Sequence, residues 1–124
     1  MSKQVIHISK RFEVTERARK VVSLEAMIAE FERIARELAQ QIALEEKRSG
    51  VHDPTSARYS TLAKATAQRH ANLLRSVEEL GSRLKIAKRE YEHAQAELQA
   101  LGPALEANQS RNKGEQISSE ARTN

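Results

Sequence analysis

The four histidines and the carboxylates are the residues of this sequence that could bind a metal or take part in catalysis. A zinc site would need a pair such as His-x-x-x-His or His-x-x-Glu, which places two ligands on one helical face. None of His7, His52, His70 and His93 has such a partner, and the chain contains no cysteine. We therefore predict no bound metal and no cofactor.

Catalytic arrangements are also missing from the sequence. It has no Gly-rich phosphate loop, no nucleophile elbow and no pair of carboxylates placed for general acid–base chemistry. His70 falls within an apolar stripe, where a polar residue more often specifies helix register than binds a ligand. The sequence therefore predicts a protein that is not an enzyme and has no small-molecule substrate.

The composition is typical of a coiled coil. Of the 124 residues, 39% are hydrophobic, 31% are charged and 3% are aromatic, and only four glycines and two prolines interrupt the chain. This balance indicates long amphipathic helices and not a globular core. The N-terminus lacks the apolar core of a signal peptide, and no stretch approaches the roughly 20 apolar residues that span a bilayer. The simplest prediction is a cytoplasmic protein.

A first apolar stripe recurs at alternating steps of three and four residues, which is a heptad pattern with Arg17 as a polar position. Helix one is expected over about residues 5–48, with Val5 and Ile8 extending its apolar face and Gly50 capping its end. The stripe consists of Val14, Val21, Leu24, Ile28, Phe31, Ala35, Leu38 and Ile42.

A second stripe follows the turn. Asp53 as the N-cap and Pro54 as the first helical residue predict a turn at residues 49–53 and helix two over about 54–101. Extended back towards the turn, this stripe is small and partly polar. It consists of Tyr59, Ala63, Thr66, His70, Leu73, Val77, Leu80, Leu84, Ala87, Tyr91, Ala94, Leu98 and Leu101.

Two helices joined by so short a connection must run antiparallel. The sequence therefore predicts an all-α fold, a long antiparallel two-helix coiled-coil hairpin over residues 1–104. Pairing the stripes places Leu24 near Leu80 and Leu38 near Thr66. Residues 105–124 are polar and contain little that could be buried, so we predict a flexible, disordered C-terminal tail there.

The net charge of +4 is unevenly distributed. Basic residues from two distant segments are expected to gather at the hairpin end that carries the termini, while acidic residues predominate towards the turn. A single charge is explained most simply by a solvated pair within a helix, such as Glu30 with Arg33 or Glu32 with Arg36. The clustering nevertheless favours a contact surface. The candidate basic set is Lys10, Arg11, Arg17, Lys20, Arg83, Lys85, Lys88 and Arg89.

Three segments resemble the FliJ family of flagellar export proteins, in the form found in alphaproteobacteria. They are residues 10–14, residues 23–33, and the turn at 50–54 with the helix start at 59–65. The resemblance covers roughly residues 8–101. It implies a role in bacterial flagellum biogenesis and motility, as a stalk of the type III secretion apparatus. Such a stalk inserts into the export ATPase ring, contacts the export-gate membrane protein and escorts substrate chaperones.

The resemblance also implies where these partners bind. Family members contact the gate through a face early in the second long helix. Matching the Tyr-x-x-apolar start of that helix to Tyr59 and Leu62 carries the face to Leu62, Thr66, Arg69 and Leu73, while a shift of one residue would select Ala63 and His70. The basic end is the hypothetical ATPase-ring contact. The implied location is the cytoplasm, peripheral to the membrane-embedded export apparatus.

Two other functions stay open. A generic coiled-coil adaptor could pair with a second hairpin and bury Met27, Ile34, Leu62 and Leu74 in a four-helix bundle. Such an adaptor would be a stable dimer, whereas a stalk would be a monomer or would self-associate weakly. Nucleic-acid binding is less favoured, because acidic residues interrupt the basic cluster and no continuous basic region precedes a zipper.

Overall fold

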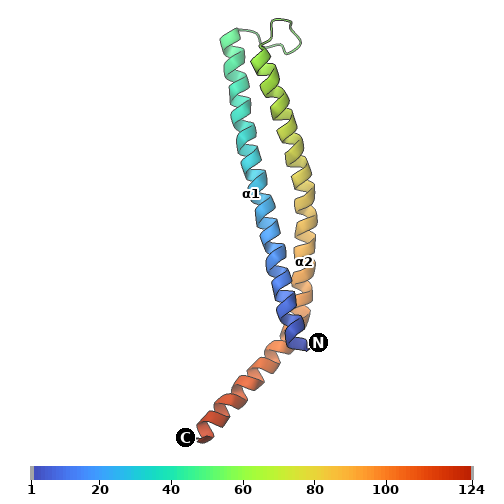
Figure 1. The fold of residues 1–124 in the computed structure, drawn as a ribbon, viewed down its shortest axis with the longest axis vertical. Helices are drawn as coiled ribbons and strands as arrows, with labels where there is room; N and C mark the ends of the chain where they lie inside the picture. The colour runs from blue at the N-terminus through green and yellow to red at the C-terminus, as the bar shows by residue number, and fades with distance from the viewer. Residues whose placement is uncertain (1, 124) are drawn as a thin grey trace. The chain divides into compact units, whose positions relative to one another are not determined.

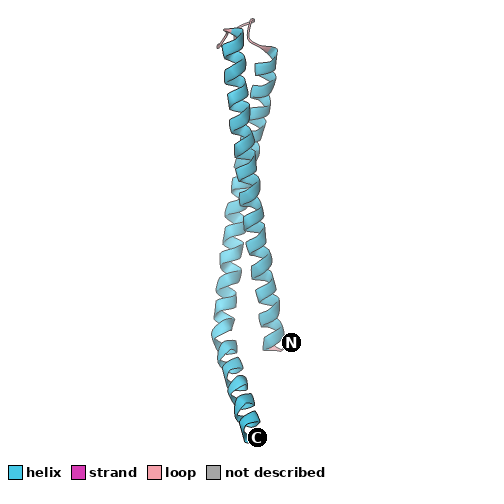
Figure 2. Cartoon of the chain, turned by 90° about the vertical axis from the view of Figure 1, so that its left-hand side faces the viewer, coloured by secondary structure: helices cyan, strands magenta, loops and turns pink. Residues whose placement is uncertain are grey.

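The computed structural model describes the backbone of residues 2–123 and the side chains of residues 2–102. This part of the chain forms two long helices and no strand: α1 (Lys3–Ser49) and α2 (Thr61–Thr123). A single loop joins them (Figure 1), and Figure 2 shows helix on both sides of that loop. The predicted all-α hairpin is confirmed. Among the described residues, neither helix has a stretch apolar and long enough to cross a membrane.

The chain divides into two compact units. Unit 1 consists of Met1–Val21 with Ala87–Asn124, and unit 2 is Val22–Ile86. Each unit contains a stretch of both helices. Each therefore has its own antiparallel interface.

The predicted heptad stripes form the interior side of both helices. In unit 2, Leu24 and Leu38 of α1 and Leu80 of α2 are buried, and in unit 1 Ala87 and Ala94 of α2 are buried. Every other predicted stripe position is at least half-buried. Because the steps of three and four hold in both units, the interface is the narrow seam of a coiled coil.

Small residues occupy much of this seam. Ala35 and Ala63 are buried in unit 2, together with Thr66. The Thr66 hydroxyl donates a 2.8 Å hydrogen bond to the Leu62 carbonyl of its own helix. This bond satisfies the hydroxyl locally, so that a polar residue can occupy the seam near the loop without a partner on α1.

The start of α1 differs from the prediction. Val5 and Ile8, expected to extend the interior stripe, are exposed. Stepping back from Val14 by four and then three residues reaches Lys10 and His7, and these two are the half-buried positions. The heptad spacing set by the longer stripe therefore overrides the local apolar pattern, and the seam of unit 1 begins with polar residues.

Ser2 fixes where α1 begins. Its hydroxyl oxygen accepts a hydrogen bond from the Val5 amide at 3.2 Å, and its carbonyl accepts one from the Ile6 amide at 3.2 Å. This is the arrangement of an N-cap serine.

The end of α1 matches the predicted glycine cap. Gly50 has a φ of +76°, and its amide donates to the Glu46 carbonyl at 2.9 Å. The Ser49 hydroxyl accepts the next amide, that of Val51, at 3.3 Å. The left-handed conformation at Gly50 thus satisfies one of the last carbonyls of α1 and turns the chain out of the helix.

The predicted start of α2 at Pro54 was wrong. The Asp53 carboxylate accepts bonds from the Thr55 amide at 3.0 Å and the Thr55 hydroxyl at 2.7 Å, and the Ser56 amide donates to the Asp53 carbonyl at 3.1 Å. Asp53 therefore closes a local turn and does not cap a helix.

Ser60 is the actual N-cap of α2. Its hydroxyl oxygen accepts from the Ala63 amide at 3.2 Å, and its carbonyl accepts from the Lys64 amide at 3.0 Å. The connection consequently occupies residues 50–60 and is longer than the predicted turn at 49–53. Serine, threonine, asparagine and aspartate all cap helices well, so composition alone did not separate Asp53 from Ser60.

At its other end, α2 continues beyond Gly102 to Thr123, whereas the sequence predicted an end near residue 101. A proline inside a helix removes one backbone hydrogen bond but does not oblige the helix to end. The side chains of residues 103–124 lie outside the described part of the structure. The flexible tail proposed for residues 105–124 stays a prediction.

Candidate partner-binding surfaces

Two of the eight basic candidates belong to the seam and not to a free surface. Lys10 is only 19% exposed, and its ammonium lies 2.8 Å from Glu13 and 3.1 Å from Glu97 of α2. Arg17, one heptad further along α1, pairs with Glu90, which lies one heptad earlier on α2. The two ion pairs are seven residues apart on each helix but run in opposite chain directions, as expected for antiparallel helices with heptad repeats.

The charges in this ion-pair cluster reinforce one another. Hydrogen bonds to Glu13 and Glu97 raise the pKa of the Lys10 ammonium. The bond from Lys10 lowers the pKa of the Glu13 carboxyl, and Arg17 at 4.0 Å adds to that effect. Both shifts favour the charged forms. Lys10 joins the two helices through Glu97, and its positive charge is already balanced by two carboxylates.

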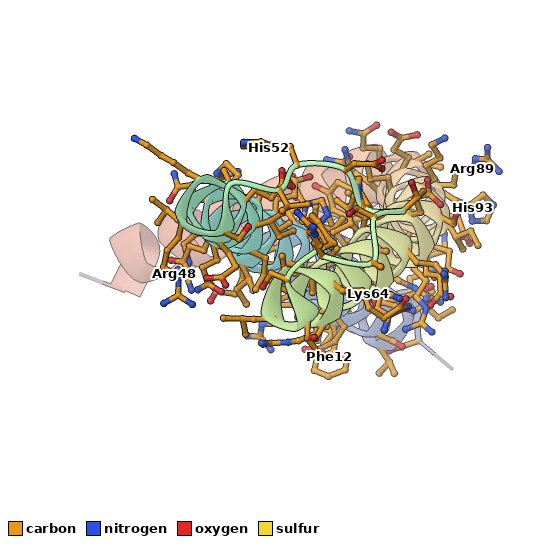
Figure 3. The ribbon with its side chains drawn as sticks, turned by 90° about the horizontal axis from the view of Figure 1, so that it is seen from above. Phe12, Arg48, His52, Lys64, Arg89 and His93 are labelled. Atoms are coloured by element: carbon orange, nitrogen blue, oxygen red, sulfur yellow. The ribbon has the colours of Figure 1, made fainter. Side chains whose placement is uncertain are left out.

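The other basic candidates are exposed. Arg11, Lys20, Lys88 and Arg89 lie on unit 1, and Arg83 and Lys85 lie on unit 2. None of them forms an ion pair with a residue whose side chain the structure describes. Figure 3 shows the Arg89 side chain pointing away from its helix. Four of the predicted cations are thus exposed on unit 1, where they can attract an anionic surface.

The sequence reasoning missed two residues of the unit 1 cluster. Glu97 accepts from Lys10 and also lies with its Oε1 2.8 Å from the Nδ1 of His93. The two residues are four apart on one helix, and this spacing predicts a contact between their side chains. His93 itself is exposed and points outward in Figure 3.

The predicted gate-binding residues divide between the seam and the surface. Tyr59, Ala63, Thr66, His70 and Leu73 all occupy seam positions facing α1. Ala63 and Thr66 are buried there, and the other three are half-buried. Only Leu62 and Arg69 of the first alternative are exposed, and both residues of the second, Ala63 and His70, lie in the seam.

Leu62 and Arg69 are exposed and lie one heptad apart, so they share the same face of α2. By the heptad register, α1 brings Leu44 to the same side of unit 2 at the level of Leu62, and Leu44 is exposed as well. We call Leu44, Leu62 and Arg69 the gate face. Leu44 was missed because it lies outside the first stripe, and only the pairing of the helices shows that it is on the same side of the seam as Leu62.

A carboxylate pair holds the loop against α1. Glu45 accepts from the Ser60 hydroxyl at 2.9 Å, and Glu46 accepts from the Tyr59 hydroxyl at 3.0 Å. The Nδ1 of His52 lies 3.5 Å from Glu46. Partial burial, followed by the bond to Glu46, raises the pKa of Tyr59. These contacts fix the beginning of α2 next to the gate face.

Charges elsewhere on α1 pair locally. Arg33 contacts Glu30 at 2.5 Å, as predicted, and also Glu37 at 2.5 Å. The predicted pair between Glu32 and Arg36 is not formed among the described residues. Such exposed pairs within one helix contribute little to stability.

The four histidines belong to no cluster of metal-ligating side chains in the part of the chain that the structure describes. Among the side chains that the structure describes, no group of three histidines, aspartates or glutamates could hold an ion. His7 and His70 lie in the seam, and His52 sits on the loop (Figure 3). The predicted partner-binding residues that are exposed thus lie on unit 1, as basic residues, and on unit 2, where Leu62 and Arg69 belong to the gate face and Arg83 and Lys85 are basic. Comparisons with protein-family models, curated proteins and solved structures found no match to this chain.

Proposed function

We propose that this chain is a FliJ-like component of the flagellar type III export apparatus. It acts as a non-enzymatic coiled-coil stalk that binds the export ATPase ring and the export-gate membrane protein and escorts substrate chaperones. It works in the cytoplasm at the periphery of the membrane-embedded apparatus. The proposal is supported by the antiparallel hairpin and by the segments at residues 10–14, 23–33 and 50–54 with 59–65 that resemble the family.

The observation that carries the ATPase contact is that four of the predicted basic residues are exposed on unit 1. Arg11, Lys20, Lys88 and Arg89 form no ion pair with a described residue, whereas Lys10 and Arg17 are already occupied across the seam. Unpaired cations accelerate association with an acidic surface and improve the specificity of the encounter. The proposed ATPase contact is accordingly reduced to this exposed group of unit 1, since Lys10 and Arg17 are paired and the exposed residues Arg83 and Lys85 lie on unit 2.

Charge reversal tests the ATPase contact. Lys20→Glu with Lys88→Glu should abolish binding to the purified export ATPase and stimulation of its hydrolysis. The matched control is Lys64→Glu with Arg75→Glu, which makes the same change in charge at two exposed cations of unit 2. Equal activity of the two variants would contradict the ATPase contact, and failure of the unaltered chain to bind would contradict the proposed function.

The gate contact is tested on unit 2. Leu62→Ser with Arg69→Glu should weaken binding to the cytoplasmic part of the gate protein, because both side chains are exposed on one face of α2. Leu74→Ser with Arg75→Glu is the control, since it changes the same residue types on other faces of that helix. Unaltered gate binding by the first variant would remove the gate face from the proposal.

A dimerising adaptor is the second candidate, because Met27, Leu62 and Leu74 are exposed. In the heptad register Met27 and Leu62 lie on one side of the seam and Leu74 lies on the other. One partner hairpin would therefore cover only part of this apolar surface. Sedimentation over a range of concentrations distinguishes the two functions, since a bundle-forming adaptor is a stable dimer.

A further inference from the structure

The first turns of α1 carry a row of apolar side chains on the side away from α2. Val5, Ile8 and Phe12 are 50%, 66% and 66% exposed. Their spacing of three and then four residues places them in line along the helix. Figure 3 shows the Phe12 ring pointing outward from the ribbon. We call these three residues the outer stripe.

The fold does not use the outer stripe. At the same level of the helix, the interior positions are His7 and Lys10, and Lys10 is bonded to Glu97 of α2. This segment therefore has its polar side inward and its apolar side outward. The remainder of α1 has the opposite arrangement, with Val14 and Val21 on the interior side.

The surroundings of the outer stripe are basic. Arg11 and Lys20 lie on opposite sides of the row, both are exposed, and neither pairs with a carboxylate among the described side chains. Residues 3–20 contain six lysines and arginines against two glutamates. A second copy of this segment would bring like charges together, so charge complementarity favours an anionic partner.

We propose that the outer stripe, with Arg11 and Lys20, docks unit 1 onto an anionic lipid bilayer. A convex row of side chains enters a fluid bilayer without needing a matching cavity. The three apolar side chains would reach the boundary between headgroups and acyl chains, while the flanking cations stay among the lipid phosphates. The contact is peripheral and is built from one helical face.

Bilayer docking goes beyond the proposed function and does not depend on it. The two activities are connected, however, because Arg11 and Lys20 also belong to the exposed cations assigned to the ATPase. One copy cannot use these side chains for both contacts at once. Purified ATPase should therefore release the chain from vesicles if both contacts exist.

The test uses the full chain and vesicles of phosphatidylcholine with or without about one-third phosphatidylglycerol. Co-sedimentation should show binding to the anionic vesicles and little binding to the neutral ones. Ile8→Ser with Phe12→Ser should lower the partition coefficient at least about tenfold, because two apolar side chains lose their burial in lipid. Val22→Ser is the matched control, since Val22 is an exposed apolar residue of α1 outside the outer stripe.

A second measurement avoids any effect of the serines on folding. The described chain has no cysteine, so Ile8→Cys and Val22→Cys each provide a single labelling site. An environment-sensitive dye at position 8 should shift to the blue on anionic vesicles, and a dye at position 22 should not. Proteolysis and circular dichroism check that each variant keeps the helical fold.

Three results would overturn the proposal. Absence of binding to anionic vesicles would show that the outer stripe does not recognise lipid, as expected if it enters a groove on another protein. Equal binding of the unaltered chain and the Ile8→Ser, Phe12→Ser variant would reduce the interaction to charge alone. An equal dye shift at positions 8 and 22 would show that the contact is not confined to the outer stripe.

Discussion

Lys10 of α1 and Glu97 of α2 form an ion pair across the seam, with the lysine Nζ 3.1 Å from the glutamate Oε2. The pair between Arg17 and Glu90 lies one heptad away on each helix. Two pairs at matching intervals fix the antiparallel register of unit 1 at a place where the seam has few large apolar side chains. Polar seam residues restrict register in this way because a slipped pairing leaves them without partners.

The ion-pair cluster predicts a loss of stability in acid. The pKa of Glu13 lies below its usual value of about 4.5 because Lys10 donates to it, and the pKa of Glu30 is lowered by Arg33. A carboxylate whose pKa is lower in the folded state contributes stability above its unfolded pKa and loses it as the pH falls through the folded value. Through these carboxylates, Tm should fall as the pH drops below about 5.

Glu13→Gln provides the control for this prediction. Glutamine keeps the size of the side chain but does not titrate, so part of the acid-dependent fall in Tm should disappear. Circular dichroism melts between about pH 2 and pH 7 measure the difference. An unchanged acid dependence in Glu13→Gln would show that Glu13 does not contribute to it.

Tyr59 provides a prediction at the alkaline end. Its hydroxyl donates to Glu46 at 3.0 Å, and its pKa is raised above 10.0, first by burial and then by this bond. A raised folded pKa contributes stability below the unfolded pKa, and that contribution is lost as the pH rises through the folded value. Tyr59→Phe should lower Tm at neutral pH and reduce the alkaline loss.

The location of this effect can also be measured. Since Tyr59 joins the loop to α1, Tyr59→Phe should speed hydrogen exchange in residues 50–60 more than in unit 1. Thr61→Ala is a suitable control, because Thr61 is exposed at the start of α2. Uniform acceleration over both units would contradict a local role for the bond between Tyr59 and Glu46.

Much of the hairpin could be predicted because a heptad pattern reports interior positions directly. The stripe from Leu73 to Leu101 and the polar positions Thr66 and His70 were all found on the interior side. The pattern failed at Val5 and Ile8. A short apolar run there competes with the register set by the longer stripe, and the register prevails because it is supported over many turns.

The loop and the gate face depended on tertiary contacts. Asp53 and Ser60 have similar intrinsic capping ability. Ser60 is the N-cap in the structure, where its hydroxyl also donates a hydrogen bond to Glu45 of α1. Leu44 comes to the same side of the seam as Leu62 only when the helices pair. The spacing of residues along one helix predicts neither the N-cap of α2 nor the position of Leu44, because each depends on a residue of the other helix.

Replacing either of two glycines by alanine should change the stability of the protein in opposite directions. Gly81 lies inside α2, and no neighbouring atom lies within 4 Å of the place that an alanine Cβ would occupy, so Gly81→Ala should stabilise the protein by about 0.5–1 kcal/mol. Gly50 has equally open space but a φ of +76°, so Gly50→Ala should destabilise it by about 1 kcal/mol. Urea unfolding measures both. Stabilisation by both variants would contradict the left-handed cap at Gly50.

Substitution of two leucines of α1 should have different effects on stability. The side chain of Leu38, in the seam, is 5% exposed, and that of Leu44, on the gate face, is 67% exposed. Leu38→Ala should cost about 2–4 kcal/mol of unfolding free energy, since it removes buried methyl groups and leaves a cavity between the helices. Leu44→Ala should change stability by no more than about 0.5 kcal/mol, because its side chain is already in water.

If the gate face functions as proposed, Leu44→Ala should instead weaken gate binding. Equal destabilisation by both variants would contradict the assignment of Leu38 to the interior, and full gate binding by a folded Leu44→Ala would remove that residue from the gate face.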